Sequence, residues 1–375
     1  MIKLMHLSDL HIGKIVNEIN MLDDQKYILE QILTVISEEK PNAVLIAGDV
    51  YDKTVPSAEA VELYDSFITQ LAKLKVAVYI ISGNHDSPER LACFNRLIEI
   101  NNIFIDGIFN GKANKHTLTS DGESINIYTL PFIKPANVRA FYDNEITDYT
   151  DAVSVVLKNS AINSDEVNVL VAHQYVTGKG TAIRSDSENI SVGGVDNVDA
   201  GVFIDFDYVA LGHLHTLQNI CQNVAYCGTP LKYSESECNS IKKIVMVEVD
   251  GKNISTRQIP LKPLHDMRTI KGTLNELTQN PVGDKNDYIF AKLTDEIEPL
   301  DAMGNLRNVY PNIMSLRFDN KRTATMNAEI KMQEISNKSP FELFNDFYFL
   351  QNNDNLNEEQ SKIITEIFKS MEENT

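Results

Sequence analysis

The chain of 375 residues has only four cysteines and no CxxC pair among them. We interpret Cys93, Cys221, Cys227 and Cys238 as small apolar residues in a reducing compartment, so neither disulfides nor a thiolate zinc site is expected. No run of 18 apolar residues occurs, and Met1 is followed by no signal-peptide pattern. We therefore expect a cytoplasmic protein that does not span a membrane.

Basic residues are also scarce relative to acidic ones. The sequence holds 34 lysines and arginines against 53 aspartates and glutamates, a formal net charge of −19. Because phosphate contact normally needs a basic surface, this balance argues against simple nucleic-acid binding. Bound cations would neutralise part of the excess if some carboxylates are metal ligands. Any binding of DNA is thus expected to be metal-assisted, localised or shared with a partner.

What the sequence does contain is a series of short apolar runs separated by helical patterns, which is typical of an α/β fold. Five runs predict buried strands of one core: Ile2–Leu7, Ala43–Ala47, Val76–Ile81, Val167–Ala172 and Tyr208–Leu211. Three more predict a second sheet packed on the first: Ile103–Ile108, Ile125–Leu130 and Ile244–Val249. Helical faces are expected within residues 28–36 and 64–71. Ser87-Pro88 predicts a further helix start, with Leu91, Phe94, Leu97 and Ile98 facing inward.

The informative polar residues follow these runs. Each of the first five runs ends, within a few residues, in a side chain that can bind metal: Asp9 and His11, Asp49, Asn84, His173, and His213 and His215. Any one of them alone would more often be a turn residue or a hydrogen-bonded core histidine. Because the carboxyl ends of strands in a layered α/β fold face a common crevice, the five together predict one site.

This ligand set indicates the kind of metal. Carboxylate, imidazole and amide groups suit divalent cations such as Mn²⁺. Seven candidates are too many for one ion, so we expect two divalent cations, preferably Mn²⁺, bridged by a carboxylate and a water. Such a pair activates water and binds both oxygens of a phosphoryl displacement. The sequence therefore predicts phosphoester hydrolysis.

His85 is expected to act differently. It follows Asn84 directly, so its side chain should point away from the ligand position. A protonated imidazole there could stabilise developing charge or protonate the leaving oxygen. Asp52, three residues after Asp49, is a candidate to orient it.

At this point the chain resembles the calcineurin-like metallophosphoesterase superfamily, and within it the bacterial SbcD nucleases. The resemblance rests on Asp9-x-His11, Gly48-Asp49-x-x-Asp52, Gly83-Asn84-His85-Asp86, His173 and Gly212-His213-x-His215, on the longer words around them, and on residues 226–234, 310–312 and 340–344. It extends over nearly the whole chain. One departure is Glu235, at a position where these proteins usually have an aromatic residue.

The resemblance implies a four-layer α-β-β-α core in residues 1–262, a small α+β capping domain in 263–335 that helps to bind DNA, and C-terminal helices in 336–375. It implies one ion bound by Asp9, His11, Asp49 and His215, and the other by Asp49, Asn84, His173 and His213. His85 would serve cleavage rather than metal binding. It further implies a homodimer formed through helices near 58–73 and 88–100. The C-terminal helices would dock on the coiled-coil base of the SMC-like ATPase subunit SbcC.

We therefore expect a Mn²⁺-dependent DNA nuclease subunit of an SbcCD-type complex. By resemblance, it would be a 3′–5′ exonuclease on duplex ends and an endonuclease on single strands or hairpins, acting in DNA repair and recombination. Two alternatives remain: a phosphoesterase of the same superfamily for small esters, and a non-catalytic subunit that binds DNA ends. The candidate phosphate contacts are Lys14, Lys53, Arg90, Lys179 and Arg184.

Overall fold

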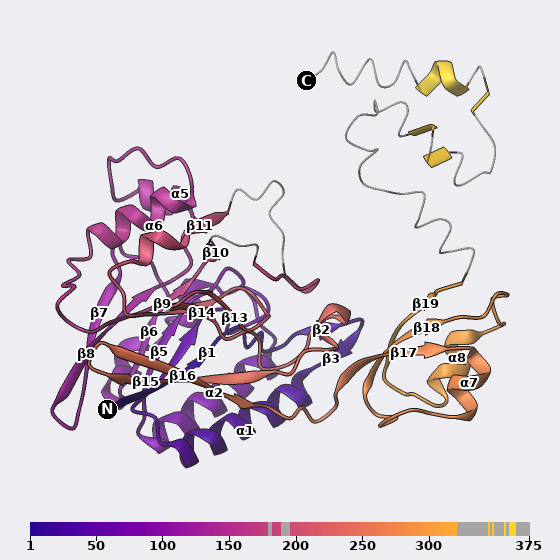
Figure 1. The fold of residues 1–375 in the computed structure, drawn as a ribbon, viewed down its shortest axis with the longest axis horizontal. Helices are drawn as coiled ribbons and strands as arrows, with labels where there is room; N and C mark the ends of the chain where they lie inside the picture. The colour runs from indigo at the N-terminus through magenta and orange to yellow at the C-terminus, as the bar shows by residue number, and fades with distance from the viewer. Residues whose placement is uncertain are drawn as a thin grey trace.

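The computed structural model describes residues 1–178, 182–188 and 196–320, and the short pieces 344–345, 347–348, 356–357 and 360–364. Within this part of the chain two six-stranded sheets face each other, and helices cover their outer faces (Figure 1). The four-layer α-β-β-α core expected from the sequence is confirmed. No helix among these residues has the length and apolar character that crossing a membrane requires.

The first sheet has the order β16-β15-β1-β4-β5-β6. Strands β1, β4, β5 and β6 are parallel, whereas β15 and β16 are antiparallel at one edge. Its strands are β1 (Ile2–Leu7), β4 (Ala43–Ala47), β5 (Ala77–Ile81), β6 (Ile103–Asp106), β15 (Lys243–Asp250) and β16 (Asn253–Pro260). Its outer face is covered by α1 (Leu22–Glu39) and α2 (Ala58–Leu74).

The second sheet has the order β13-β14-β12-β9-β8-β7, with parallel strands β14, β12, β9 and β8 between antiparallel edges. Its strands are β7 (Asn114–Ser120), β8 (Glu123–Leu130), β9 (Asn168–His173), β12 (Tyr208–Gly212), β13 (Gln218–Cys221) and β14 (Val224–Tyr226). Helices α5 (Pro135–Arg139) and α6 (Tyr149–Lys158) pack on its outer face.

The predicted assignment of strands to sheets was partly wrong. The runs at 103–108 and 244–249 form β6 and β15 of the first sheet, and those at 167–172 and 208–211 form β9 and β12 of the second. Only the run at 125–130 (β8) was assigned correctly to the second sheet. Strands buried on both faces share the same apolar composition, so composition cannot say which sheet a strand joins.

Side-chain alternation explains the layers. In β1, Ile2 and Leu4 face the second sheet, while Met5 and Leu7 face the helices. This is the two-residue period of a strand with both faces buried. The helical faces predicted in 28–36 and 64–71 are confirmed, because they pack on the first sheet.

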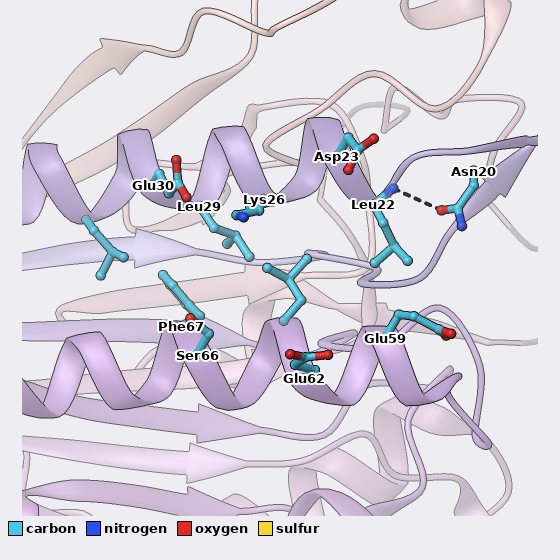
Figure 2. Close-up of a pocket in the computed structure, with 12 residues that line it drawn as sticks. Asn20, Leu22, Asp23, Lys26, Leu29, Glu30, Glu59, Glu62, Ser66 and Phe67 are labelled. Carbon is cyan, nitrogen blue, oxygen red and sulfur yellow. Dashed lines mark hydrogen bonds between the residues drawn. The ribbon is translucent and has the colours of Figure 1, made fainter.

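The groove between α1 and α2 runs along the outer surface of the first sheet (Figure 2). It has a volume of about 510 Å³, with leucines and Phe67 at its floor and carboxylates such as Glu30, Glu59 and Glu62 at its rim. Helix α1 is followed by its C-cap Lys40, which has left-handed backbone angles and precedes Pro41. The N-cap of α2 is Ser57, whose hydroxyl accepts from the Ala60 N–H.

The helix predicted from Ser87-Pro88 is shorter than expected. Ser87 caps α3 (Pro88–Leu91), but Phe94 adopts φ 61° and separates it from α4 (Asn95–Ile98), which runs into the 3-10 turn η1 (Glu99–Asn101). Leu91 is buried, whereas Phe94 and Leu97 are 72% and 64% exposed. The expectation that Phe94 and Leu97 face inward was wrong, because the chain breaks at Phe94, whereas Leu91 and Ile98 pack on the core as expected.

A third, parallel sheet with the order β17-β18-β19 forms a separate unit at one side of the molecule (Figure 1). It consists of β17 (Met267–Gly272), α7 (Leu274–Gln279), β18 (Tyr288–Leu293), α8 (Ala302–Arg307) and β19 (Ile313–Phe318), and has its own apolar core. This unit lies within the predicted capping domain. Most of the predicted C-terminal helices fall outside the described residues.

The remaining elements are short. They are the hairpin β2 (Ile15–Val16) and β3 (Ile19–Asn20), the parallel pair β10 (Tyr175–Thr177) and β11 (Asn197–Asp199), and the 3-10 turns η2 (Ala200–Phe203) and η3 (Glu235–Glu237).

Candidate metal centre

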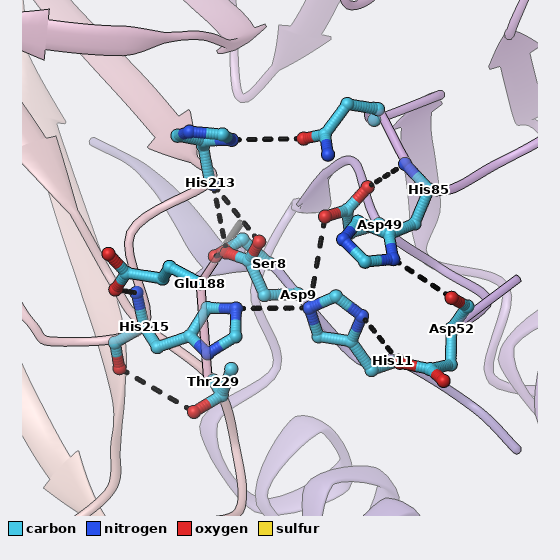
Figure 3. Close-up of polar contacts among 12 residues, drawn as sticks. Ser8, Asp9, His11, Asp49, Asp52, His85, Glu188, His213, His215 and Thr229 are labelled. Carbon is cyan, nitrogen blue, oxygen red and sulfur yellow. Dashed lines mark hydrogen bonds and ion pairs between the residues drawn. The ribbon is translucent and has the colours of Figure 1, made fainter. Parts of the chain in front are cut away.

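The predicted ligands meet where the carboxyl ends of the two sheets come together (Figure 3). The first sheet supplies Asp9 and His11 after β1, Asp49 after β4, and Asn84 after β5. The second supplies His173 at the end of β9, and His213 and His215 after β12. Asp9, His11, Asp49, His173 and His215 are all buried. The site thus joins the two sheets.

The backbone at this junction adopts conformations that are unusual for residues other than glycine. Asp9, His11, Asp49 and His213 have φ values of 51°, 46°, 48° and 111°. Hydrogen bonds hold two of these turns together, from Asp9 N to Gly48 O (3.0 Å) and from His11 N to Asp49 O (2.9 Å). Strain of this kind persists where the surrounding structure imposes it, and it concentrates at functional sites.

One group of ligands consists of Asp9, His11 and His215, whose candidate ligand atoms lie within 4.8 Å of one another. The Nε2 atoms of His11 and His215 are 3.1 Å apart. The Asp49 Oδ2 atom is 3.8 Å from His11 Nε2, so this carboxylate borders the group.

A second group lies around Asp49 and Asn84. His173 Nε2 is 3.4 Å from Asp49 Oδ2 and 3.0 Å from Asn84 Oδ1. His213 Nδ1 is 2.9 Å from the same Asn84 oxygen. Asp49 therefore lies between His11 and His173, as a bridging carboxylate would.

The electrostatics favour a cation. Burial lowers the pKa of His213 and of His215 to about 3, so both imidazoles are neutral at ordinary pH. Burial alone would also lower the pKa of His173, but attraction to Asp49 and Asp9 raises it to about 9. The same carboxylates would attract a metal ion.

The donor set fits divalent metal ions. Two imidazole nitrogens face each other at 3.1 Å, and the Asn84 oxygen faces two more imidazoles. The buried Nδ1 of His11 has no hydrogen-bond partner. Imidazole, carboxylate and amide groups that converge in this way are the ligands that such ions use.

Family comparison agrees with this geometry. Residues 2–217 match the calcineurin-like phosphoesterase family. A relative from Staphylococcus epidermidis, named as the SbcD subunit of nuclease SbcCD, is 35% identical over 344 residues, which cover 88% of this chain and 90% of the relative. The chain belongs to the SbcD branch of the calcineurin-like phosphoesterases.

Other similarities extend the description of this SbcD-family chain. Residues 263–352 match the family described as type 5 capsule protein repressor C-terminal domain. Two solved structures are similar at low identity. A Thermus thermophilus protein is 12% identical with a TM-score of 0.40, covering 68% of this chain and 98% of that one. A Danio rerio dimetal phosphatase is 11% identical with a TM-score of 0.41, covering 70% and 99%.

His85 lies beside the two ligand groups of the SbcD-family chain. Its backbone N–H donates to Asp49 Oδ1 at 2.9 Å, and its ring packs edge-on against His11 at 4.9 Å between centroids. Its Nδ1 is 2.9 Å from the backbone carbonyl of Asp52. Asp52 thus contacts His85 as expected, but through its main chain. Its carboxylate accepts from Lys14 at 2.6 Å and lies 3.6 Å from His11 Nδ1.

Several residues that support the site were not identified as such from the sequence. Asp86 accepts from the N–H groups of Gly83, Val50 and Tyr51, which ties the loop after β5 to the loop after β4. Ser187 and Glu188 contact His215, and Glu237 and Lys242 lie behind them. They lie in loops or, for Glu237, in the 3-10 turn η3, where no periodic pattern indicates the direction of a side chain.

The five candidate phosphate contacts have different surroundings. Lys14 is paired with Asp52 and is mostly buried, which makes it part of the site's framework. Lys53 and Arg90 are exposed. The Arg184 guanidinium carbon lies 3.8 Å from the centroid of the Tyr175 ring, and that ring is 6.3 Å from the His213 ring. Lys179 lies outside the described residues.

Proposed function

We propose that this chain is the nuclease subunit of an SbcCD-type complex and hydrolyses DNA phosphodiesters with two Mn²⁺ ions. The observation that carries the proposal is the convergence of seven candidate metal-binding side chains from both sheets, most of them buried, with His85 beside them. The similarity to a relative named as the SbcD subunit of nuclease SbcCD, over most of both chains, supports the choice of DNA as substrate and of SbcC as partner.

Divalent cations, when bound, supply Lewis-acid activation of water and neutralise phosphate charge. Asp9, His11, Asp49 and His215 would hold one ion, and Asp49, Asn84, His173 and His213 the other. Because burial lowers the pKa of His213 and of His215 to about 3, both imidazoles are neutral and neither would repel a cation.

His85 has the position of a general acid. Because a carbonyl oxygen can only accept, His85 Nδ1–H donates to Asp52 O, and this bond fixes the orientation of the ring. The other nitrogen, Nε2, is then the atom that can hold a proton for the leaving oxygen. Asp52 is a positioning residue in this scheme, acting through its carbonyl.

A groove beside His85 offers a place for a nucleic-acid strand. It has a volume of about 430 Å³ and is lined by Asp52, Lys53, Thr54, Val55, Asn84 and His85. Lys53 lines the groove, and Arg184 is held over Tyr175 near His213, so both can contact phosphates that flank the scissile one. A few local cations of this kind are compatible with a chain of net charge −19.

Further aspects of the proposal follow from family resemblance. The activity would be 3′–5′ exonucleolytic on duplex ends and endonucleolytic on single strands or hairpins, in cytoplasmic DNA repair and recombination. SbcC would bind the C-terminal segment, residues 336–375. A homodimer would form through α2 and the α3–α4 segment, where Phe94, Leu97 and Ile100 are 72%, 64% and 81% exposed.

The test is degradation of end-labelled linear duplex DNA by the purified chain in Mn²⁺, alongside His85→Ala. We expect wild-type cleavage that a chelator abolishes, and a rate roughly 10²–10⁴-fold lower in the variant, the range for loss of a general acid. Equal Mn²⁺ binding by the two proteins is the control. Cleavage of small phosphate esters but not of DNA, with or without SbcC and ATP, would contradict the proposed substrate. Chelator-resistant binding of DNA ends without cleavage in any divalent metal would indicate a non-catalytic subunit.

A further inference from the structure

The side of His215 that faces away from the metal centre is held by a chain of polar contacts. Its Nε2 faces His11, whereas its Nδ1 lies 2.6 Å from the Ser187 hydroxyl. The same hydroxyl lies 2.7 Å from Glu237 Oε1 and 2.6 Å from the Ser185 hydroxyl. Ser187 therefore connects an imidazole of the metal centre to a buried carboxylate.

Glu237 is ionised in this setting. Its Oε2 accepts from Lys242 Nζ at 2.5 Å, and only 1% and 8% of the two side chains are exposed. Burial alone would raise the pKa of Glu237, but attraction to Lys242 brings it down to about 2. The ammonium group also donates to Thr229 Oγ1 at 2.7 Å and to the His215 carbonyl at 2.9 Å. A carboxylate in this state can only accept hydrogen bonds.

The single hydrogen of the Ser187 hydroxyl determines which group donates in each of these contacts. The Ser187 hydroxyl has one hydrogen, and its contact with ionised Glu237 requires that hydrogen. The contact with His215 must therefore run the other way, with Nδ1–H donating to the Ser187 oxygen. The Ser185 hydroxyl can donate to the same oxygen. Neutral His215 consequently has its lone pair on Nε2.

The main chain of His215 is held from the same loop. Its N–H donates to Glu188 Oε1 at 2.7 Å (Figure 3), and Glu188 is the next residue after Ser187 in the sequence. The loop of residues 185–188 thus contacts both the backbone and the ring of His215.

We propose that Ser187 is a positioning residue that, with Glu237 and Lys242 behind it, selects the Nδ1–H tautomer of His215 and so directs the Nε2 lone pair to a metal ion. This inference rests on the proposed two-metal function. Partners that fix the tautomer of a ligand histidine generally contribute 10–100-fold to metal affinity.

The test is Mn²⁺ titration of the full chain by isothermal calorimetry, with wild type and Ser187→Ala compared. We expect two ions in the wild type, and in the variant one ion bound about 10–100-fold more weakly while the other is little changed. Ser160→Ala is the matched control, since Ser160 makes two main-chain hydrogen bonds far from the site. Its Mn²⁺ affinities should equal those of the wild type.

A second pair of variants covers the case in which Ser187→Ala does not fold. Ser187→Thr keeps the hydroxyl. Ser187→Val introduces a side chain of nearly the same shape as threonine but without the hydroxyl. Only Ser187→Thr should therefore retain tight binding of both ions. Equal affinities in Ser187→Thr and Ser187→Val, or wild-type affinities in Ser187→Ala, would overturn the inference. A wild type that binds no Mn²⁺ would instead refute the two-metal function itself.

Discussion

His6 lies in the middle of β1 and is fully buried between the two sheets. Its Nε2 contacts the Leu211 carbonyl at 3.1 Å, so it must donate there, and its Nδ1 then accepts from the Tyr208 hydroxyl at 3.0 Å. No sequence pattern assigned this histidine a role. It connects the first sheet to β12 three residues before Asp9, and so helps to align the sheet ends that form the metal centre.

The burial of His6 predicts a pH-dependent stability. Burial lowers its pKa from about 6.5 to about 3, so below pH 6.5 the unfolded chain binds a proton that the folded chain does not. Stability is therefore lost as the pH falls from 6.5 toward 3. Between pH 7 and pH 5 this histidine should remove about 2 kcal/mol from the free energy of unfolding, measured by urea denaturation.

The comparison for this prediction is His6→Gln, whose amide can replace both hydrogen bonds but does not titrate. The wild type should lose about 2 kcal/mol more than the variant between the two pH values. Because the other histidines are common to both proteins, their contributions cancel. The same loss in both proteins would show that His6 does not carry the effect.

At the scale of elements, the carboxyl ends of β4 and β12 approach so closely that glycine is required there. A Cβ on Gly212 would lie 1.9 Å from the Ala47 carbonyl oxygen, and one on Gly48 would lie 2.4 Å from His173 Nδ1. That nitrogen donates to Ala47 O at 2.8 Å, which orients His173 toward the centre. The two sheets can share one metal centre because these positions have no side chain.

Gly48→Ala should therefore disrupt both the fold and metal binding. Gly122 is the matched control, since both glycines have φ 82° but nothing lies within 4 Å of a Cβ at Gly122. Gly122→Ala should cost only the backbone strain, about 1–2 kcal/mol. Gly48→Ala should cost about 1–3 kcal/mol more through overpacking, and should weaken Mn²⁺ binding by displacing His173. Urea denaturation and calorimetry would measure both, and equal losses of stability in the two variants would refute the crowding argument.

The elements also mark how far the sequence could predict this structure. The convergence of the seven candidate ligands was predicted, because each follows an apolar run directly and strand ends converge in this class of fold. The sequence did not predict that β6 and β15 join the first sheet, because sheet membership depends on which strands pair across long sequence separations. The contacts of Ser187 and Glu237 with the site come from a loop and from the short turn η3, where no periodicity indicates the direction of a side chain.

At the scale of the whole molecule, polar contacts attach the unit formed by β17–β19 to the catalytic core. Asp24 of α1 is buried and accepts from the Tyr288 hydroxyl at 2.6 Å and from the His265 N–H at 3.1 Å. Glu235 pairs with Lys292 at 2.7 Å and with Arg317 at 3.4 Å. The acidic residue that departs from the usual aromatic one therefore has a role here, as an ion-pair partner of the neighbouring unit.

The cluster of exposed apolar side chains on the α3–α4–η1 segment predicts the oligomeric state. Phe94, Leu97 and Ile100 are 72%, 64% and 81% exposed there. Side chains of this kind tend to be covered by a partner when they are clustered. If they form the proposed dimer interface, sedimentation should give twice the 42.2 kDa mass of the chain.

Leu97→Glu should then convert the dimer to a monomer, because burying an unpaired carboxylate in an apolar interface costs several kcal/mol. Ile297→Glu is the matched control, since Ile297 is 86% exposed but lies in the unit formed by β17–β19. It should leave the mass unchanged. The Leu97 variant should still bind two Mn²⁺ ions, because its segment supplies no ligand. A wild-type monomer, or a dimer that survives Leu97→Glu, would mean that another surface joins the chains or that none does.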